Sequence, residues 1–410
     1  PNIKIHWKEA KGFSLIDIYG KKFIDFTSGI FTSAIGYNNK YFEKQITKAL
    51  KSGFYHSYNY YNSYREKYIS KLIKFVNSPK IEKCFLLSSG TEATEAAMKF
   101  ARTYGSTINK NKKGIICLSG NWHGRTVGSA LLSGNNKQTK WIGYTDKKIN
   151  HLDWPYPWLN IKDNKKFFYN SIKKIFGKNY NFKKNTCLFM LETFQGWGAM
   201  FYPKNYIKEV ERFCKKNNIV LCFDEIQAGF GRTGKKFGFE HYGVNPDLIC
   251  CGKGMGSGFP LSGVLGSKKI IENKNVSGMS STHSGNPISC AAGIATIDII
   301  KKNNLISNSR KLGDILHVNL NKMKNLNKNL IKETQGHGLI GAIIFKDYKK
   351  YPSKKIADIF SQLCTDKGLL ICNTGRESVK LGPPLITNKK GLLKSINILF
   401  ECLGNLKRSI

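Results

Sequence analysis

Acidic residues are scarce in this sequence: 27 Asp and Glu stand against 66 Lys and Arg, which gives a formal net charge of +39 over 410 residues. Such an excess of cations can indicate a nucleic-acid partner or an anionic surface. The lysines are spread along the whole chain, however, and no segment has the basic and aromatic pattern of an RNA-binding module. We therefore interpret the charge as a compositional bias that should favour acidic substrates, and we expect no specific nucleic acid as a partner.

Long apolar runs are also missing. None approaches the roughly 18 residues that a membrane span requires, and no apolar signal-peptide core occurs between Pro1 and Gly20. The eleven cysteines include no CxxC pair, and no His/Glu or His/Cys cluster has the spacing of metal ligands. We expect a cytoplasmic protein with reduced thiols, no membrane association and no bound metal.

The pattern that is present, strands alternating with helices from about residue 65 onward, is typical of an α/β domain with a mostly parallel sheet. The main helices are predicted at Thr91–Tyr104 and Tyr206–Asn217. The apolar runs predict strands at Cys84–Leu87, Gly114–Leu118, Thr186–Leu191, Ile219–Phe223, Leu248–Cys251 and Ser262–Leu265.

The two ends of the chain predict a second, smaller α+β domain. After an irregular start, a hairpin is predicted from Leu15–Tyr19 and Phe23–Phe26, followed by a helix at Lys40–Lys51. Later units are helices at Pro287–Lys302, Ser307–Met323, Lys354–Lys367 and Lys390–Leu403, and strands at Leu339–Phe345 and Leu369–Cys372. We divide the chain into an N-terminal segment (1–55) that packs with the small domain, a large domain (56–290) and a C-terminal small domain (291–410).

Two of the central strands lead into charged residues. Asp224 follows one apolar run, and Lys253 follows the next, between two glycines. Neighbouring parallel strands end at the same edge of a sheet. An acid and a lysine placed there suit a cofactor that has a basic ring nitrogen and an aldehyde, and pyridoxal 5'-phosphate (PLP) is such a cofactor. The alternative is that Asp224 caps a helix and that Lys253 is solvated.

Two further segments follow strands. Ser89-Gly90-Thr91 opens a helix whose free N–H groups could bind a phosphate, although the same residues could simply cap that helix. After the next strand, Trp122 could stack on a flat cofactor and Arg125 could clamp a carboxylate. An ordinary loop with a packed tryptophan is the alternative.

Two glycine-rich segments argue against nucleotide binding. Residues 229–236 nearly match a P-loop, but Lys236 stands where a serine or threonine must hold magnesium. Residues 252–258 lack the GxGxxG spacing, and no helical pattern follows them. Both NTPase and nicotinamide-dependent functions are therefore poor interpretations.

Taken together, the segments resemble the class III PLP-dependent aminotransferases of fold type I. The resemblance covers essentially the whole chain, with the motifs in the family's order and spacing. The matching motifs are SSGTEATEAA (88–97), WHGRT (122–126), LETFQGWG (191–198), FDEIQAGFGRTGK (223–235), CGKGMGSGFPLSGVLG (251–266), THSGNP (282–287) and LGPPL (381–385).

The resemblance implies a role for each matching residue. Lys253 would attach PLP covalently and carry the substrate proton, and Asp224 would keep the ring nitrogen protonated. Gln227 would lie near the phenolic oxygen, with Glu192 behind it and Asp224. The remaining cofactor contacts would be Trp122 on one ring face, Ser89, Gly90 and Thr91 on the phosphate, and Thr282 reaching the phosphate of the neighbouring subunit in a homodimer.

Two positions depart from the family and concern the substrate. Trp197 replaces a glutamate that pairs with an arginine in many ω-amino acid members, and Lys380 stands at the position of that arginine. Lys380 could still bind a carboxylate as a point charge, or it could merely face solvent. Arg376 lies nearby and could substitute for the missing arginine, and Arg125 resembles the arginine that holds the distal carboxylate of glutamate.

The main hypothesis is a PLP-dependent transaminase. It would move an amino group from an ω-amino acid or related amine to 2-oxoglutarate or pyruvate, and the nearest subgroups act on 4-aminobutyrate, ornithine, acetylornithine and diaminobutyrate. A second hypothesis keeps the cofactor but makes the protein an aminomutase, decarboxylase or racemase. The third is a non-catalytic polyanion-binding protein on the same fold, which would bind nucleic acid in a salt-sensitive way.

Overall fold

Seven strands form the central sheet of the large domain. The structure, a computed structural model, describes residues 5–58 and 60–410. Five neighbouring strands run parallel, and β12 is antiparallel to both of its neighbours. The predicted mostly parallel sheet and its six predicted strands are confirmed. In sheet order the strands are β4 (Lys83–Leu87), β12 (Ser262–Gly266), β11 (Leu248–Cys251), β10 (Val220–Asp224), β7 (Thr186–Glu192), β5 (Gly114–Leu118) and β6 (Ile149–Leu152).

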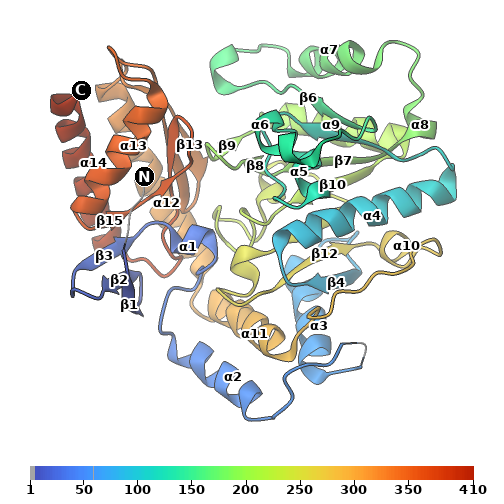
Figure 1. Cartoon of the computed structure of the whole chain (residues 1–410), viewed down its shortest axis with the longest axis horizontal. Coiled ribbons are helices and arrows are strands. Elements are labelled where there is room, and N and C mark those ends of the chain that lie inside the picture. The colour runs from blue at the N-terminus through green and yellow to red at the C-terminus, as the bar shows by residue number, and fades with distance from the viewer. Residues whose placement is uncertain (1–4, 59) are drawn as a thin grey trace.

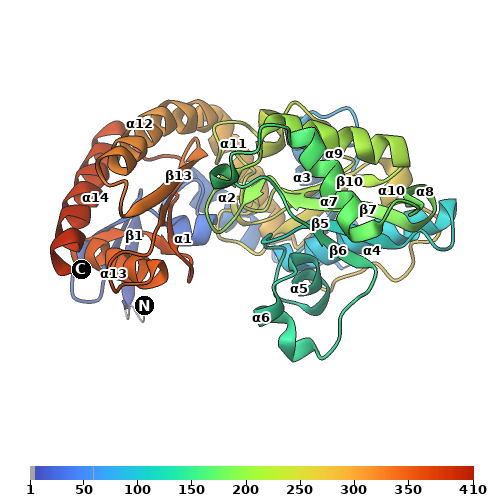
Figure 2. The same ribbon diagram turned by 90° about the horizontal axis from the view of Figure 1, so that it is seen from above.

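This sheet is buried on both faces because helices cover each of them. Alternate residues of β7 point to opposite cores: Leu188 packs with the alanine-rich face of α4 (Gly90–Ile108), and Phe189 packs with α7 (Asn164–Phe176) and α9 (Lys204–Asn217). Figure 2 shows α9 above the strands and α5 (Val127–Ser133) below them. Because helices cover both faces of the sheet, the strands are continuous apolar runs and do not alternate between apolar and polar residues.

The small domain is built from both ends of the chain, and Figure 1 places the two termini on the same side of the molecule. The N-terminal strands form a sheet in the order β1-β2-β3-β15, in which β3 pairs in parallel with β15. A second sheet has the order β13-β14-β17-β16. The strands are β1 (Trp7–Lys11), β2 (Ser14–Asp17), β3 (Lys22–Asp25), β13 (Ile331–His337), β14 (Ile340–Phe345), β15 (Leu369–Leu370), β16 (Cys372–Asn373) and β17 (Ser378–Leu381).

Helices complete both domains, and the boundaries at residues 55 and 290 stay a prediction. None of the helices in the described ranges is long and apolar enough to cross a membrane. The remaining helices are α1 (Ser28–Phe31), α2 (Lys40–Leu50), α3 (Ser63–Val76), α6 (Asn136–Thr139), α8 (Phe182–Asn185), α10 (Lys268–Ile271), α11 (Pro287–Lys302), α12 (Leu305–Leu326), α13 (Ser353–Asp366) and α14 (Lys389–Ser409). The short elements are strands β8 (Phe194–Gln195) and β9 (Met200–Phe201) and 3-10 helices η1 (Lys140–Ile142), η2 (Pro157–Leu159), η3 (Gly238–His241) and η4 (Lys253–Met255).

Two local predictions were wrong. Trp7–Lys11 is not irregular, because it forms β1, which pairs antiparallel with β2; residues 1–4 lie outside the described residues. Leu369–Cys372 is not one strand: β15 pairs with β3, whereas β16 pairs with β17 in the other sheet. One continuous strand could not be an edge of both sheets, so the chain crosses from one to the other at Ile371.

The short element α1 has an unusual backbone. Ser28, Gly29, Ile30 and Phe31 all have φ between 47° and 69°, the left-handed region that L-residues rarely adopt in succession. The preceding Asp25 carboxylate accepts hydrogen bonds from Thr27 and Ser28, which helps to fix the turn. The turn directs the buried Phe31 ring into the seam between the two domains.

Candidate active site

Two acids lie side by side at the ends of neighbouring strands. Asp224 is the last residue of β10, and its partner in the parallel register is Glu192, the last residue of β7. Both side chains are buried. Burial and the nearby Asp224 charge raise the pKa of Glu192 to about 7.

The Asp224 carboxylate is held by one histidine and one backbone group. The Oδ2 atom lies 2.8 Å from Nδ1 of His123, and Oδ1 accepts a hydrogen bond from the N–H of Ile226 at 3.1 Å. His123 is 2% exposed, and its own N–H donates to Ser133 Oγ at 2.8 Å. This fixes the direction in which the carboxylate faces, so His123 is a functional candidate that the sequence analysis did not assign.

Lys253 follows β11 and begins η4 with a left-handed backbone, φ 44°. Burial lowers the pKa of its amine, while the charges of Asp224 and Glu192 act in the opposite direction. The effect of burial is the larger one. A lysine held closer to neutrality is a better nucleophile toward an aldehyde than a solvated lysine. Lys253 is half-buried, which disagrees with its interpretation as an ordinary solvated lysine.

The N-terminus of α4 lies at the end of β4 and offers backbone N–H groups. The Glu92 carboxylate accepts hydrogen bonds from the N–H of Ser88 at 3.2 Å and of Ser89 at 2.7 Å, and from the Ser89 hydroxyl at 2.9 Å. The N–H groups of Gly90 and Thr91 belong to the first turn and have no acceptor within the helix. These two groups remain for an anion, whereas the Ser89 hydroxyl already serves the helix cap.

The loop after β5 brings Trp122 to the same region. Its backbone N–H donates to Glu192 Oε2 at 2.8 Å, and its ring lies 5.0 Å from the guanidinium of Arg125. Trp122 is half-buried, and Arg125 is exposed. The ring is thus anchored beside the strand ends, with a cation at the solvent side.

Lys380 points into the protein, not into solvent. It lies on β17, is 8% exposed, and its Nζ donates to Gln227 Oε1 at 3.0 Å. Gln227 Nε2 in turn faces Glu192 Oε1 at 3.4 Å. The Lys380 Nζ also lies 4.7 Å from the centre of the Phe31 ring. Burial lowers the pKa of Lys380 to about 8, with the charge of Lys253 acting in the same direction.

Trp197 and Arg376 form a stacked pair. The Arg376 guanidinium carbon is 3.7 Å from the centre of the Trp197 ring. The Trp197 indole N–H donates to Gln195 Oε1 at 3.0 Å. Neither residue bonds to Lys380, so the two positions that depart from the family each have a partner of another kind.

Thr282 lies apart from this group. It is exposed, and its carbonyl accepts a hydrogen bond from His56 Nε2 at 2.6 Å. Among the described residues its hydroxyl makes no hydrogen bond. This position within one chain is what a contact to a neighbouring subunit would require.

Glycines allow the close approach of these groups. A Cβ on Gly196 would come within 2.5 Å of Glu192 Oε1 and 2.6 Å of Gln227 Nε2. A Cβ on Gly90 would come within 2.9 Å of Ile226, the residue whose N–H binds Asp224. Side chains at either position would push the acid and amide groups out of place.

The P-loop-like segment has a structural task. Arg232 is 2% exposed, and its guanidinium donates to the carbonyls of Leu339 and Pro383. It therefore ties the large domain to two segments of the small domain and is not free to bind a nucleotide.

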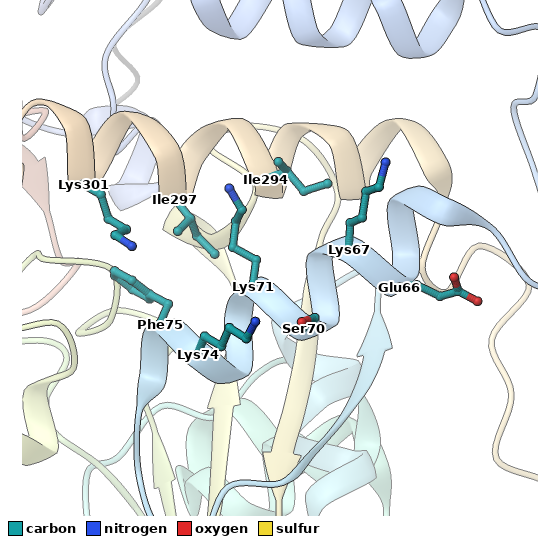
Figure 3. A pocket seen from close by; sticks show the side chains of 9 residues that line it. All are labelled: Glu66, Lys67, Ser70, Lys71, Lys74, Phe75, Ile294, Ile297 and Lys301. Carbon is teal, nitrogen blue, oxygen red and sulfur yellow. The ribbon is translucent and has the colours of Figure 1, made fainter.

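A cavity of about 630 Å³ lies elsewhere, between α3 and α11 (Figure 3). It is lined by four lysines, among them Lys71, which pairs with Asp298 outside the lining. None of its lining residues belongs to the group around Lys253. This cavity is separate from the candidate site.

The residues at the strand ends fit PLP. The donor set contains a lysine with a lowered pKa, a buried carboxylate for a ring nitrogen, and a helix N-terminus for a phosphate. The glycines at 90 and 196 leave the backbone close to these groups.

The comparisons with known proteins agree with this geometry. The profile of the family described as Aminotransferase class-III matches residues 1–403. The chain is 30% identical over 405 residues to an acetylornithine aminotransferase of Prochlorococcus marinus, covering 97% of this chain and 91% of that protein. It is 32% identical to an acetylornithine aminotransferase of Methanocaldococcus jannaschii, covering 98% of this chain and 94% of that protein.

Solved structures have the same fold. A transaminase from a marine Virgibacillus bacterium superposes with a TM-score of 0.89 at 25% identity, covering 99% of this chain and 94% of that one. An amine transaminase from an uncultivated Pseudomonas species, solved in its PLP-bound form, superposes with a TM-score of 0.88 at 23% identity, covering 98% and 95%.

The family match spans nearly the entire chain, and the relatives are aligned over almost their full length. The fold type I architecture predicted from the motifs is confirmed. The chain belongs to the class III aminotransferases and is a PLP-dependent transaminase of the ω-amino acid type.

Proposed function

We propose that this enzyme transfers the terminal amino group of N-acetylornithine, or a closely similar N-acylated ω-amino acid, to 2-oxoglutarate. The observation that carries the proposal is the pair of Asp224 and Lys253 on neighbouring strand ends, in a chain related over its whole length to acetylornithine aminotransferases. The enclosed cation of Lys380 supports a donor that carries a carboxylate.

The proposed roles of the central residues follow from their surroundings. Bound PLP supplies an electron-withdrawing ring that stabilises negative charge on the carbon bearing the amino group. Asp224, held by His123, would keep a proton on the ring nitrogen through its carboxylate. The Lys253 amine would take the proton from the substrate carbon and return it later in the transfer, since a lysine of lowered pKa can act as base and as acid. The backbone of Gly90 and Thr91 would hold the phosphate.

The substrate contacts are proposed from charge and position. Lys380 has three N–H donors, of which the described contacts use one on Gln227, so donors remain for a carboxylate.

Arg125 would bind the distal carboxylate of 2-oxoglutarate from the solvent side of Trp122. Trp122 would cover the cofactor ring, and Glu192 and Gln227 would support the side facing Lys380. Arg376 stacks on Trp197 and would act at the edge of this substrate region.

We also propose a homodimer with active sites at the subunit interface. Exposed aromatic side chains gather just before α3, including Tyr55 at 59%, Tyr60 at 78% and Tyr61 at 91% exposure. This segment joins the Thr282 loop through His56 and through Asn286, whose amide donates to the Tyr55 carbonyl. Tyr61→Glu should shift the dimer toward monomer in light scattering. Retention of a full dimer with the same affinity would contradict this interface.

A cytoplasmic location remains a proposal. Its support is that ten of the eleven free thiols are buried, as expected of cysteines that act as small apolar residues in a reducing compartment.

The test is the visible absorption spectrum of the purified, PLP-loaded enzyme. N-acetylornithine should bleach the cofactor band and 2-oxoglutarate should restore it, while ornithine, 4-aminobutyrate and 2,4-diaminobutyrate should act more slowly. Bleaching by one of those donors alone would overturn the proposed donor. Arg125→Ala should impair 2-oxoglutarate more than pyruvate, and equal rates with both acceptors before and after the change would contradict its assignment.

A further inference from the structure

Two tryptophans of the large domain lie beneath two cations of the small domain. The Arg376 guanidinium carbon is 3.7 Å from the centre of the Trp197 ring, and Lys332 Nζ is 3.8 Å from the centre of the Trp158 ring. The cation–ring contacts elsewhere in the described residues are longer. The two rings are themselves neighbours, with centres 6.4 Å apart. Arginine or lysine over tryptophan is the most favourable pairing of this type.

Trp197 is bonded to both domains. On the large-domain side, its indole N–H donates to Gln195 Oε1, and the Gln195 amide donates to the Ser119 carbonyl at 2.9 Å. On the small-domain side, Arg376 covers the ring, and the Ser378 hydroxyl donates to the Trp197 carbonyl at 2.7 Å. One residue therefore links the turn between β8 and β9 to the start of β17.

The same strand carries Lys380. Ser378 is the first residue of β17, and Lys380 stands two residues later, where a strand side chain returns to the same face. Whatever fixes Ser378 against Trp197 therefore fixes the direction in which Lys380 reaches Gln227.

We propose that Trp197 and Arg376 form an interdomain clasp, with Trp158 and Lys332 as its outer half, that positions Lys380 for the carboxylate of the substrate. Trp197 is a positioning residue in this scheme: its ring acts through Arg376, which precedes β17, and its carbonyl through Ser378, the first residue of that strand, so it need not touch the substrate. The inference rests on the carboxylate-binding role proposed above for Lys380. It explains why a tryptophan can stand where many ω-amino acid members have a glutamate: the ring binds a cation without carrying a charge of its own.

The test measures binding without turnover. Pentanoate, a carboxylate with no amino or keto group, is titrated calorimetrically into the PLP-loaded enzyme. Trp197→Leu and Arg376→Met should each weaken pentanoate binding about tenfold, because each removes the cation–ring contact. The double variant should bind no more weakly than the poorer single variant, since both changes break one unit. PLP affinity and the cofactor band should stay unchanged.

Conservative variants and a matched control separate positioning from loss of structure. Trp197→Phe and Arg376→Lys should recover part of the affinity, because each keeps a ring or a cation. The control is Lys322→Met, which removes a cation 5.9 Å from the Phe400 ring, a contact between α12 and α14 inside the small domain. It should leave pentanoate binding unchanged. If Trp197→Leu does not fold, pentanoate binding is compared between Arg376→Met and Arg376→Lys, because Arg376 is half-exposed and its replacement should not prevent folding.

Two results overturn the inference in distinguishable ways. If Lys380→Met weakens pentanoate binding but Trp197→Leu and Arg376→Met do not, the clasp is wrong and the role of Lys380 stands. If the unaltered enzyme and Lys380→Met bind pentanoate equally weakly, the carboxylate role of Lys380 is wrong and the clasp loses its function with it.

Discussion

The two sides of the proposed active site are held in different ways. On the cofactor side, Asp224 and Glu192 are adjacent by strand register, and Lys253 follows the next strand after one glycine. On the substrate side, Lys380 and Arg376 arrive from the small domain and are placed by side-chain contacts with Gln227 and Trp197. Register in a buried sheet leaves little room for variation, whereas pairings across a seam can be exchanged. The proposed cofactor contacts are therefore fixed by the sheet, whereas the proposed substrate contacts depend on pairs of side chains.

The largest effect should come from the cofactor side. Lys253→Ala removes the base and should lower the transfer rate by at least about 10³-fold. Lys235→Ala, a change of an exposed lysine in the preceding family motif (223–235) and outside the proposed site, is the matched control. Steady-state transfer with 2-oxoglutarate measures the effect. A rate within tenfold of the unaltered enzyme would show that another group moves the proton.

The substrate side should respond in affinity and in its pH dependence. Lys380→Met should raise KM for carboxylate substrates about 10- to 100-fold, the effect expected for losing a charge-assisted hydrogen bond, with kcat much less changed. The pKa of Lys380 is lowered to about 8, so its positive charge is lost as pH rises through 8, and KM should increase above that pH. Lys380→Arg should flatten this rise because arginine stays charged. The measurement is KM between pH 6.5 and 9.5 for the unaltered enzyme and for Lys380→Arg. A rise in KM that persists in Lys380→Arg would exclude Lys380 as its source.

His123 tests the cofactor side separately, because its ring contacts the Asp224 carboxylate. His123→Phe leaves the buried Asp224 carboxylate without its side-chain partner and should reduce kcat about tenfold and weaken PLP binding. His151→Gln is the control, since His151 bonds to the Leu132 carbonyl and not to Asp224. Equilibrium dialysis of PLP and kcat are the measurements. Equal behaviour of the two variants would remove His123 from the site.

The smallest effect concerns the stability of the seam between the two domains at low pH. Burial lowers the pKa of His241 and of His317 to about 4, below the value of about 6.5 in an unfolded chain, and the His241 ring stacks 4.8 Å from that of His337. The unfolded chain therefore binds more protons, and stability should fall as pH decreases from about 6.5 to about 4. Allowing for partial solvent access, each histidine should account for about 1–2 kcal/mol of this loss. Urea unfolding at pH 7 and at pH 4.5 should show a smaller difference for His241→Gln; an unchanged difference would locate the acid sensitivity elsewhere.

The sequence predicted what buried strands and motif order determine. The central strands, Asp224, Lys253 and the start of α4 were found because apolar runs and the residues after them are local signals. The contacts that orient these side chains are not local. His123 lies 101 residues from Asp224, and Lys380 lies 153 residues from Gln227, so no spacing rule could pair them. The stacking of Trp197 on Arg376 could not be predicted for the same reason. The left-handed turn at 28–31 could not be predicted either, because Ile30 and Phe31 ordinarily prefer negative φ values.

The parallel pair of β3 and β15 has a consequence for how the chain folds. Besides β2, strand β3 pairs with β15, and it finds this second partner only after Leu369 and Leu370 have been synthesised, far along the chain. Contacts between such distant segments are slow to form because the loop between them must close first. The strands of the large-domain sheet all come earlier in the chain, so this domain can assemble before the N-terminal hairpin has paired with β15. Truncation after Lys367 should then yield a folded sheet with an unpaired N-terminal edge, a species prone to associate with other chains.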